Sequence, residues 1–162
     1  MNDRDFEKLY RQHFDPVYRF ALSLTLDEHR AEEITQNTFF KALQTIDDFR
    51  GECSVKTWLC TIAKNLFLSE QRKKKTEPLE AFEQLPDGSA GPEERTLQRD
   101  ESIRLHRLLH ELPEPFKEVF SLRVFAQLSF KEIGSLFGKS ENWACVVYHR
   151  ARTKFHNRED ML

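Results

Sequence analysis

One segment near the middle of the chain interrupts a sequence that otherwise repeats its apolar residues with helical spacing. Residues 76–101 read TEPLEAFEQLPDGSAGPEERTLQRDE and contain three prolines and two glycines. Because proline and glycine break regular structure when they recur this often, a stable helix is not expected through the middle of the segment. The segment also carries eight acidic residues and two arginines, which is typical of a solvated tether. The chain is therefore predicted to form two domains, residues 1–75 and 102–162, joined by an acidic linker over 76–101.

The residues before the linker are predicted to form a bundle of three helices. Apolar residues recur at three- and four-residue intervals from Phe6 to Leu22 and again from Ala31 to Ile46, as one buried face of a helix requires. Ser54 is a suitable N-cap for a third helix, which ends in the basic run of residues 72–75.

The residues after the linker are predicted to contain a helix-turn-helix. Ser129 and Glu132 fit a capping box, in which each side chain accepts a hydrogen bond from a backbone N–H of the new helix. Gly138 suits the positive φ that often ends a helix, and Ser140 can cap the next one. The inner face of that last helix is expected to hold Ala144, Val147 or Tyr148, Ala151 and Phe155. The predicted fold class is all-α, with two small helical domains.

Two of these helices carry enough positive charge to contact nucleic acid. Residues 142–158 include four basic residues and no acidic one, and helix-turn-helix geometry places such a helix in the major groove of DNA. In the first domain, Lys56, Lys64 and the basic run are interleaved with Trp58, Phe67 and Asn65, a combination that single-stranded nucleic acid can use. Simpler interpretations stay open: a solvated cationic face, a tryptophan in the core, and a basic run that complements the helix dipole.

Composition and motif content exclude several function classes. The formal net charge is −2, so the whole molecule is not a uniformly basic DNA-coating protein. The three cysteines (Cys53, Cys60 and Cys145) form no CxxC pair, and the six histidines form no HExxH motif. We therefore expect no metal, no cofactor and no enzymatic activity. The charged N-terminus lacks a secretory apolar stretch and no run is long enough to span a bilayer, which predicts a cytoplasmic location.

Ordered fragments in both domains resemble one protein family. Residues 31–42 read AEEITQNTFFKA, and FRG, TWL and IAKN follow at 49–51, 57–59 and 62–65. After the linker come LP at 112–113, EVF at 118–120, LS at 128–129, EIG at 132–134, FG at 137–138 and HRAR at 149–152. In this order and spacing, they resemble regions 2 and 4 of the extracytoplasmic-function (ECF) sigma factors, which are two-domain specificity subunits of bacterial RNA polymerase in the sigma-70 family.

The resemblance implies roles for residues of the first domain. Glu33, Gln36 and Asn37 would bind the clamp coiled coil of the largest subunit of core RNA polymerase. The loop before the third helix would receive a flipped base of the promoter's minus-ten element, and a pocket there must offset the cost of extruding it. The implied minus-ten DNA-binding residues are Asp48, Phe49, Arg50, Lys56, Trp58, Lys64, Asn65 and Arg72.

In the second domain, the resemblance implies that the last helix reads the minus-thirty-five element. The implied contact residues are Ser140, Asn142, Cys145, Val146, His149, Arg150 and Arg152. The chain departs from the family pattern here, because Cys145 and Val147 replace a lysine and an arginine. Groove contacts there are therefore expected either to be apolar, for example to a thymine methyl group, or to come from Arg150 and His149, and the promoter sequence is expected to differ from the common one. Ser69 and Asn37 also replace acidic residues that the family commonly has.

Three functional hypotheses follow. The leading one is an alternative sigma factor that directs core RNA polymerase to specific promoters and is held inactive by an anti-sigma factor, either free or membrane-anchored. The second is a stand-alone helix-turn-helix regulator that binds operator DNA without polymerase. The third is an interaction module that docks on polymerase without supporting initiation. The partners expected under the leading hypothesis are core RNA polymerase, promoter DNA and an anti-sigma factor, with no small-molecule substrate.

Overall fold

The computed structural model describes residues 2–76 and 104–160, and every regular element in those ranges is helical. The elements are α1 (Asp3–Thr25), α2 (Glu28–Thr45), the short 3-10 helix η1 (Ile46–Asp48), α3 (Val55–Thr76), a helical stretch over 104–110, α5 (Phe116–Val124), α6 (Phe130–Leu136) and α7 (Glu141–Asp160). The prediction of an all-α protein is confirmed. The predicted acidic linker lies outside the described residues except for its first one.

Three N-caps determine where the helices of the first domain begin. The Asn2 side chain accepts a hydrogen bond from the Asp5 backbone N–H at 2.9 Å, and the Asp27 side chain accepts one from Arg30 at 3.1 Å. The Ser54 hydroxyl oxygen accepts one from the Thr57 backbone N–H at 3.1 Å, as the sequence predicted. Each cap satisfies a backbone donor that has no partner within the helix.

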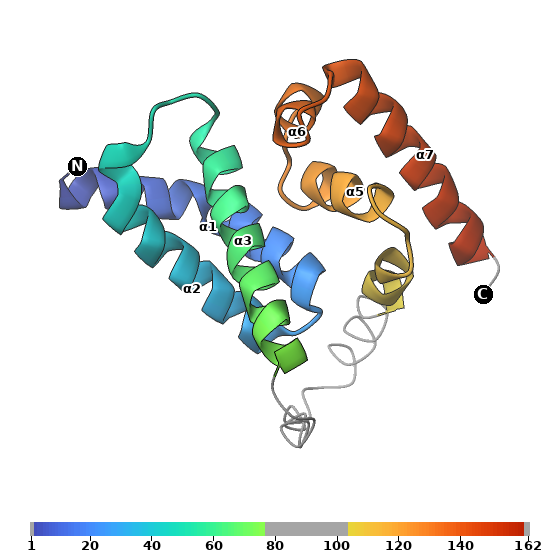
Figure 1. Cartoon of the computed structure of the whole chain (residues 1–162), viewed down its shortest axis with the longest axis horizontal. Helices are drawn as coiled ribbons and strands as arrows, with labels where there is room; N and C mark the ends of the chain where they lie inside the picture. Colours follow the sequence, from blue (N-terminus) through green and yellow to red (C-terminus); the bar gives the residue numbers. More distant parts are fainter. Residues whose placement is uncertain (1, 77–103, 161–162) are drawn as a thin grey trace.

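The α1–α3 bundle buries the apolar faces that the sequence pattern marks (Figure 1). Phe20 of α1, Ile34 of α2 and Leu59 of α3 have no exposed surface. Two threonines of α2 also lie in this core, and their hydroxyls donate to backbone carbonyls one turn earlier, at 2.7 Å in both cases. The polar positions Thr35 and Thr38 therefore leave no unsatisfied donor in the interior.

The second domain contains the predicted helix-turn-helix. The Ser129 hydroxyl oxygen accepts from the Glu132 backbone N–H at 3.1 Å, and a Glu132 carboxylate oxygen accepts from the Ser129 N–H at 2.8 Å. Gly138 follows α6 with a φ of 64°, which glycine adopts without steric cost. Apolar spacing also predicts that Phe116, Val119, Phe120 and Val124 form the buried face of α5. Val119 is buried, but Val124 is 39% exposed at the C-terminal end of the helix.

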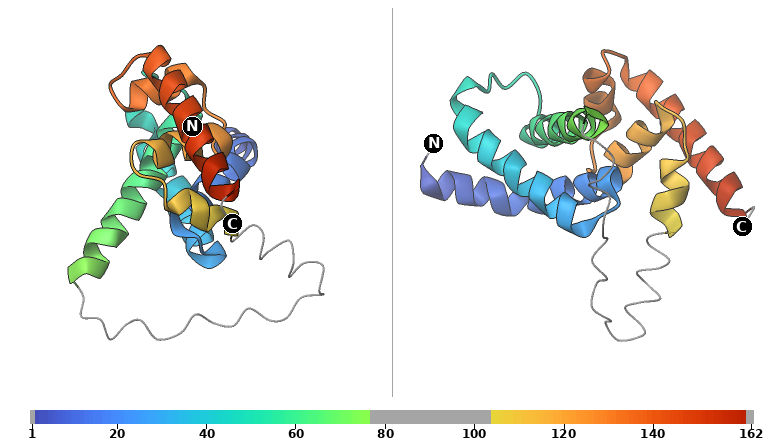
Figure 2. Two further views of the ribbon diagram at one scale, coloured as in Figure 1. Left: turned by 90° about the vertical axis from the view of Figure 1, so that its right-hand side faces the viewer. Right: turned by 60° about the horizontal axis from the view of Figure 1, so that its bottom comes forward.

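The two domains lie against each other. α5 and α6 lie next to α3, whereas α7 lies on the outer side of the second domain (Figures 1 and 2). Buried apolar residues from both domains, among them Leu59 of α3 and Val119 of α5, belong to one cluster. The arrangement brings α3 close to the helix-turn-helix, a proximity that no sequence pattern predicts.

Candidate polymerase and DNA interfaces

The outer face of α2 presents the three residues expected to bind polymerase. Glu33, Gln36 and Asn37 are all exposed, on the side of the helix opposite the buried stripe. This placement follows from helical geometry, since positions 36 and 37 lie three and four residues, or about one turn, after position 33. The side chain of Gln36 donates a long hydrogen bond of 3.5 Å to Glu32.

Two apolar residues extend this face, and sequence reasoning did not include them. Phe40 is 62% exposed and Leu43 is 47% exposed, and they follow Gln36 by one and two helical turns. An exposed phenylalanine beside polar residues is typical of a surface that a partner covers. Their spacing from Gln36 was a signal that could have identified them, because it places both outside the buried stripe.

The loop between η1 and α3 carries an aromatic pair. The rings of Phe49 and Trp58 lie with their centroids 4.8 Å apart and their planes 32° apart, and both side chains are half-buried. Asp48 and Arg50 on either side of Phe49 are exposed. Gly51 has a φ of 70° and open space where a Cβ would lie, so it provides the loop's reversal by its backbone alone. Trp58 also packs against the core cluster, which agrees with the structural interpretation of its helical position.

The polar and basic side chains of α3 that are expected to bind DNA fall into two groups. Asn65 and Arg72 are exposed, and Lys73, Lys74 and Lys75 occupy the last turn. Lys56 and Lys64 instead contact the second domain: the Lys56 ammonium donates to the Gln127 carbonyl at 2.8 Å, and Lys64 forms an ion pair with Glu118. The expected minus-ten residues thus lie on one helix and the segment before it, and Lys56 and Lys64 among them contact the second domain.

The expected minus-thirty-five residues lie on α7 and its cap. The Ser140 hydroxyl accepts from the Trp143 backbone N–H at 3.1 Å and so starts the helix. Along α7, the outward residues are Asn142, Val146, His149, Arg150 and Arg152, with Cys145 half-buried beside them. The exposed side of α7 therefore combines two arginines and a histidine with the apolar surface of Val146.

The burial of Val147 excludes one of the alternatives expected for groove contacts by α7. Val147 is only 7% exposed and packs in the core with Ala144 and Ala151, so it cannot supply an apolar contact to a DNA groove. The helical spacing of three and four residues between these positions explains the burial. Tyr148, the alternative inner residue, is half-buried, and its ring lies 5.5 Å from that of Phe130.

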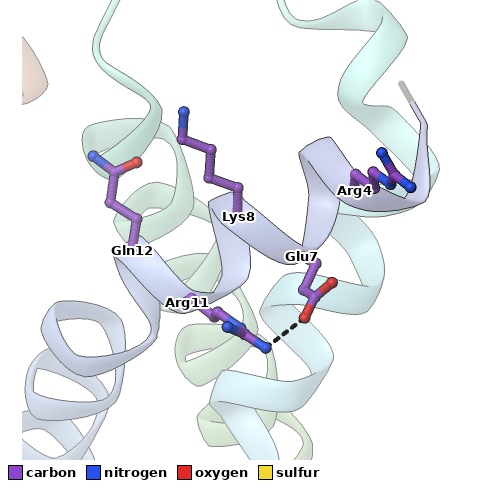
Figure 3. A pocket seen from close by; sticks show the side chains of 5 residues that line it. All are labelled: Arg4, Glu7, Lys8, Arg11 and Gln12. Carbon is purple, nitrogen blue, oxygen red and sulfur yellow. Dashed lines mark hydrogen bonds and ion pairs between the residues drawn. The ribbon is translucent and has the colours of Figure 1, made fainter.

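Cys53 and Cys60 are not activated thiols, and the hollow on α1 is shallow. Burial raises the pKa of Cys60 to about 12, and burial together with Glu52 raises the pKa of Cys53, so neither thiol is activated as a thiolate. No group of three potential metal ligands occurs within 2–76 and 104–160. A shallow hollow on α1 is lined by side chains of that helix alone, with Arg11 paired to Glu7 at 2.6 Å and pointing away from Lys8 and Gln12 (Figure 3).

No helix in the described part of the chain has the length and apolar character needed to cross a membrane.

Comparison with known proteins assigns a family to both domains. Residues 9–77 match sigma-70 region 2, and residues 102–155 match sigma-70 region 4. The chain is 33% identical over 157 residues to the RNA polymerase sigma factor YlaC of Bacillus subtilis (strain 168), covering 94% of this chain and 91% of YlaC. It is 30% identical over 150 residues to the ECF RNA polymerase sigma factor SigM of the same organism, covering 91% of each.

A solved structure shows the same fold. The sigma factor RpoE, crystallised with the anti-sigma factor NepR from Bartonella quintana, superimposes with a TM-score of 0.69 at 22% identity, covering 95% of this chain and 96% of that one. Sigma factors have no catalytic site of their own, in agreement with the non-enzymatic prediction. Two sigma-70 regions in the expected order, with relatives of this similarity, lead to one conclusion: the chain belongs to the ECF sigma factors of the sigma-70 family.

Proposed function

We propose that this sigma factor binds core RNA polymerase through the outer face of α2 and directs it to promoters through two separate DNA-binding surfaces. The observation that carries the proposal is the presence, on one chain, of an exposed polar face in region 2 and an exposed cationic helix in region 4. A stand-alone regulator would need only the second of these. A sigma factor needs both, because it must bind the polymerase and the DNA at the same time.

In region 2, Glu33, Gln36 and Asn37 would contact the clamp coiled coil of the largest polymerase subunit, and Phe40 and Leu43 would add apolar area to that contact. Polar residues beside an exposed aromatic anchor are the composition of an interface centre and rim. The η1–α3 loop and the α3 residues from Lys56 to Arg72 would bind the melted minus-ten element. The Phe49–Trp58 pair offers an aromatic surface there for an extruded base.

In region 4, α7 would lie in the major groove of the minus-thirty-five element. Arg150 can donate two hydrogen bonds to a guanine, while Cys145 and Val146 can contact a thymine methyl group. Asn142 and Arg152 would contact base edges or phosphates, and the N-terminus of α7, capped by Ser140, would face the backbone.

An anti-sigma factor is the proposed regulator. The support is the shared fold with RpoE, which was crystallised with the anti-sigma factor NepR. Such an inhibitor would bind the surfaces that polymerase or promoter DNA needs. Purification of the chain from its native host without any associated inhibitor, under both inducing and non-inducing conditions, would contradict this part of the proposal.

A gel-shift experiment separates this function from operator binding by the chain alone. The promoter fragment is incubated with the purified chain, with core polymerase, and with both. We expect a stable complex only with both proteins, since each DNA surface alone provides a small contact. A tight complex with the chain alone, unaffected by core polymerase, would instead support a stand-alone regulator.

A further inference from the structure

Phe130, the first residue of α6, lies against a residue on the exposed side of α7. The helix α7 runs along both α5 and α6 (Figure 1). The centroid of the Phe130 ring is 6.4 Å from that of His149 and 5.5 Å from that of Tyr148, and the rings of Tyr148 and His149 are 5.4 Å apart. His149 is exposed, whereas Phe130 and Tyr148 are half-buried. One ring of α6 therefore lies beside an exposed imidazole of α7.

The Phe130 ring is itself held by a residue of α5. The guanidinium carbon of Arg123 lies 4.2 Å from the centroid of the Phe130 ring, which is within the range of a cation–π contact. A guanidinium nitrogen of Arg123 also donates to the Leu128 carbonyl at 2.9 Å, in the turn before α6. Because this hydrogen bond ties the guanidinium to the backbone, Arg123 stays over the ring and limits its movement.

The same group of rings is anchored in the interior of region 4. Phe120 of α5 lies with its ring centroid 6.0 Å from Tyr148 and 5.3 Å from Phe155, and its ring is nearly stacked on both. Phe130 and Tyr148 pack against the buried cluster. Rings at these separations are in contact and restrict one another's rotamers. Phe130 therefore connects a packed aromatic network to the exposed ring of His149.

The neighbouring arginines of α7 have no comparable support. Among residues 2–76 and 104–160, Arg150 and Arg152 are exposed and form neither a hydrogen bond nor an ion pair with another side chain or the backbone. A side chain recognises a base edge best when packing holds its rotamer close to the binding geometry. His149 meets this condition before any DNA is bound, and Phe130 is the residue of α6 that provides it.

We propose that Phe130 is a positioning residue for the minus-thirty-five element, whose ring holds the His149 imidazole in one orientation so that His149 discriminates between bases. The inference rests on the proposed function, because that function places the exposed side of α7, and His149 with it, in the major groove. Phe130 acts through His149 and makes no contact with a base. Promoter specificity would then depend on a residue outside the recognition helix.

The first test measures base discrimination by the holoenzyme formed from core polymerase and the full-length chain. Competition binding is carried out with promoters altered one base pair at a time, and His149→Ala identifies the base pair that depends on His149. Phe130→Leu keeps an apolar side chain but removes the ring, and should lower discrimination at that base pair roughly 3–10-fold. Other base pairs should change by less than about twofold. Phe130→Tyr keeps the ring and should retain normal discrimination.

A double variant shows whether Phe130 acts through His149. In the presence of His149→Ala, Phe130→Leu should cause no further loss of discrimination, because the effects of residues that act as one unit are not additive. Phe116→Leu is the matched control. Phe116 is also a half-buried phenylalanine of region 4 that packs against the buried cluster, but its ring contacts Lys154 at 5.2 Å instead of His149. Phe116→Leu should leave base discrimination unchanged.

The second test observes the His149 side chain directly in the free full-length chain. Three-bond couplings measured by nuclear magnetic resonance report whether its χ1 angle occupies one rotamer or averages over several. Phe130→Leu should increase this averaging, whereas Phe130→Tyr and Phe116→Leu should not. Circular dichroism verifies that all variants remain helical.

The possible outcomes are distinct. An equal loss of affinity at every base pair in Phe130→Leu would overturn the proposal, because it would indicate a general structural role. Unchanged discrimination, an equal effect from Phe116→Leu, or no effect of His149→Ala at any base pair would overturn it as well. The promoter preference of the unaltered holoenzyme judges the proposed function. If that holoenzyme prefers no promoter, the proposed function fails, while the couplings still decide whether Phe130 fixes His149.

Discussion

At the scale of single residues, Gly134 is a position where side-chain size decides whether the helix-turn-helix can close. A Cβ built on Gly134 would lie 2.6 Å from the Ser140 carbonyl oxygen and 2.8 Å from its carbonyl carbon. Both are backbone atoms, so the turn between α6 and α7 would have to shift. We expect Gly134→Ala to lower the free energy of unfolding by about 1–3 kcal/mol in chemical denaturation. Ser135→Ala, at the exposed neighbouring position, should change it little; equal effects would show that Gly134 is not sterically required.

The buried ring of His106 is expected to make the protein less stable in mild acid. Burial lowers the pKa of His106 below its usual 6.5, and its ring stacks on that of Phe125 at 5.3 Å. The unfolded chain therefore binds the proton more readily, so the stabilisation from the neutral ring is present above about pH 6.5 and is lost as the pH falls below that value. Denaturation at pH 7.5 and 5.5 should show lower stability at the acidic pH. His106→Leu should reduce the difference; an unchanged difference would assign it to His13 and His110, whose pKa values burial also lowers.

Arg150 should determine promoter preference at one base pair. Its side chain is exposed on α7, and the proposed function places it against a guanine in the major groove. Arg150→Ala should weaken holoenzyme binding to the preferred promoter by about 1–3 kcal/mol and reduce discrimination at that base pair. The measurement is competition binding with promoters altered one base pair at a time. Lys131→Ala, which removes an exposed charge from α6, is the control; an unchanged preference in Arg150→Ala would exclude base recognition by this residue.

At the scale of elements, α2 separates stability from binding. Its buried stripe, including Ile34, Thr35 and Thr38, holds the bundle together, whereas its outer face is exposed. Gln36→Ala and Glu33→Lys should therefore leave the melting temperature nearly unchanged and lower the affinity for core polymerase. Asp15→Lys, an equal charge change on exposed α1, serves as control for Glu33→Lys in the same binding assay. Normal polymerase affinity in both α2 variants would remove the proposed role of this face.

Local patterns predicted most of the helices, and for a clear reason. Apolar spacing and side-chain caps act over three or four residues, so Ser54, the Ser129–Glu132 box and Gly138 could be identified from the sequence alone. Helical spacing left the inner face of α7 open between Val147 and Tyr148, because that choice also depends on the angle at which α7 packs on its neighbours. The partners of Lys56 and Lys64 could not be predicted, because Lys56 and Gln127 are 71 residues apart and their contact depends on how two domains meet.

At the scale of the whole molecule, the proposed function assigns this chain one surface for the polymerase and two surfaces for DNA. Buried residues of both domains belong to one cluster, so the two domains are packed together in the arrangement seen here. In this arrangement, Lys56 and Lys64 contact region 4. A promoter, by contrast, separates its two recognition elements along the duplex. Under the proposed function, polymerase rather than DNA alone therefore brings the chain into its active arrangement.

Run-off transcription with core polymerase over a randomised promoter library is the sharpest test of the proposed function. We predict that transcripts start at a defined subset of promoters with two conserved elements, and only when the chain and core polymerase are both present. Two results would show that the chain does not direct core polymerase to specific promoters. One is no more initiation with the chain and core polymerase together than with core polymerase alone, and the other is selected promoters that share no sequence.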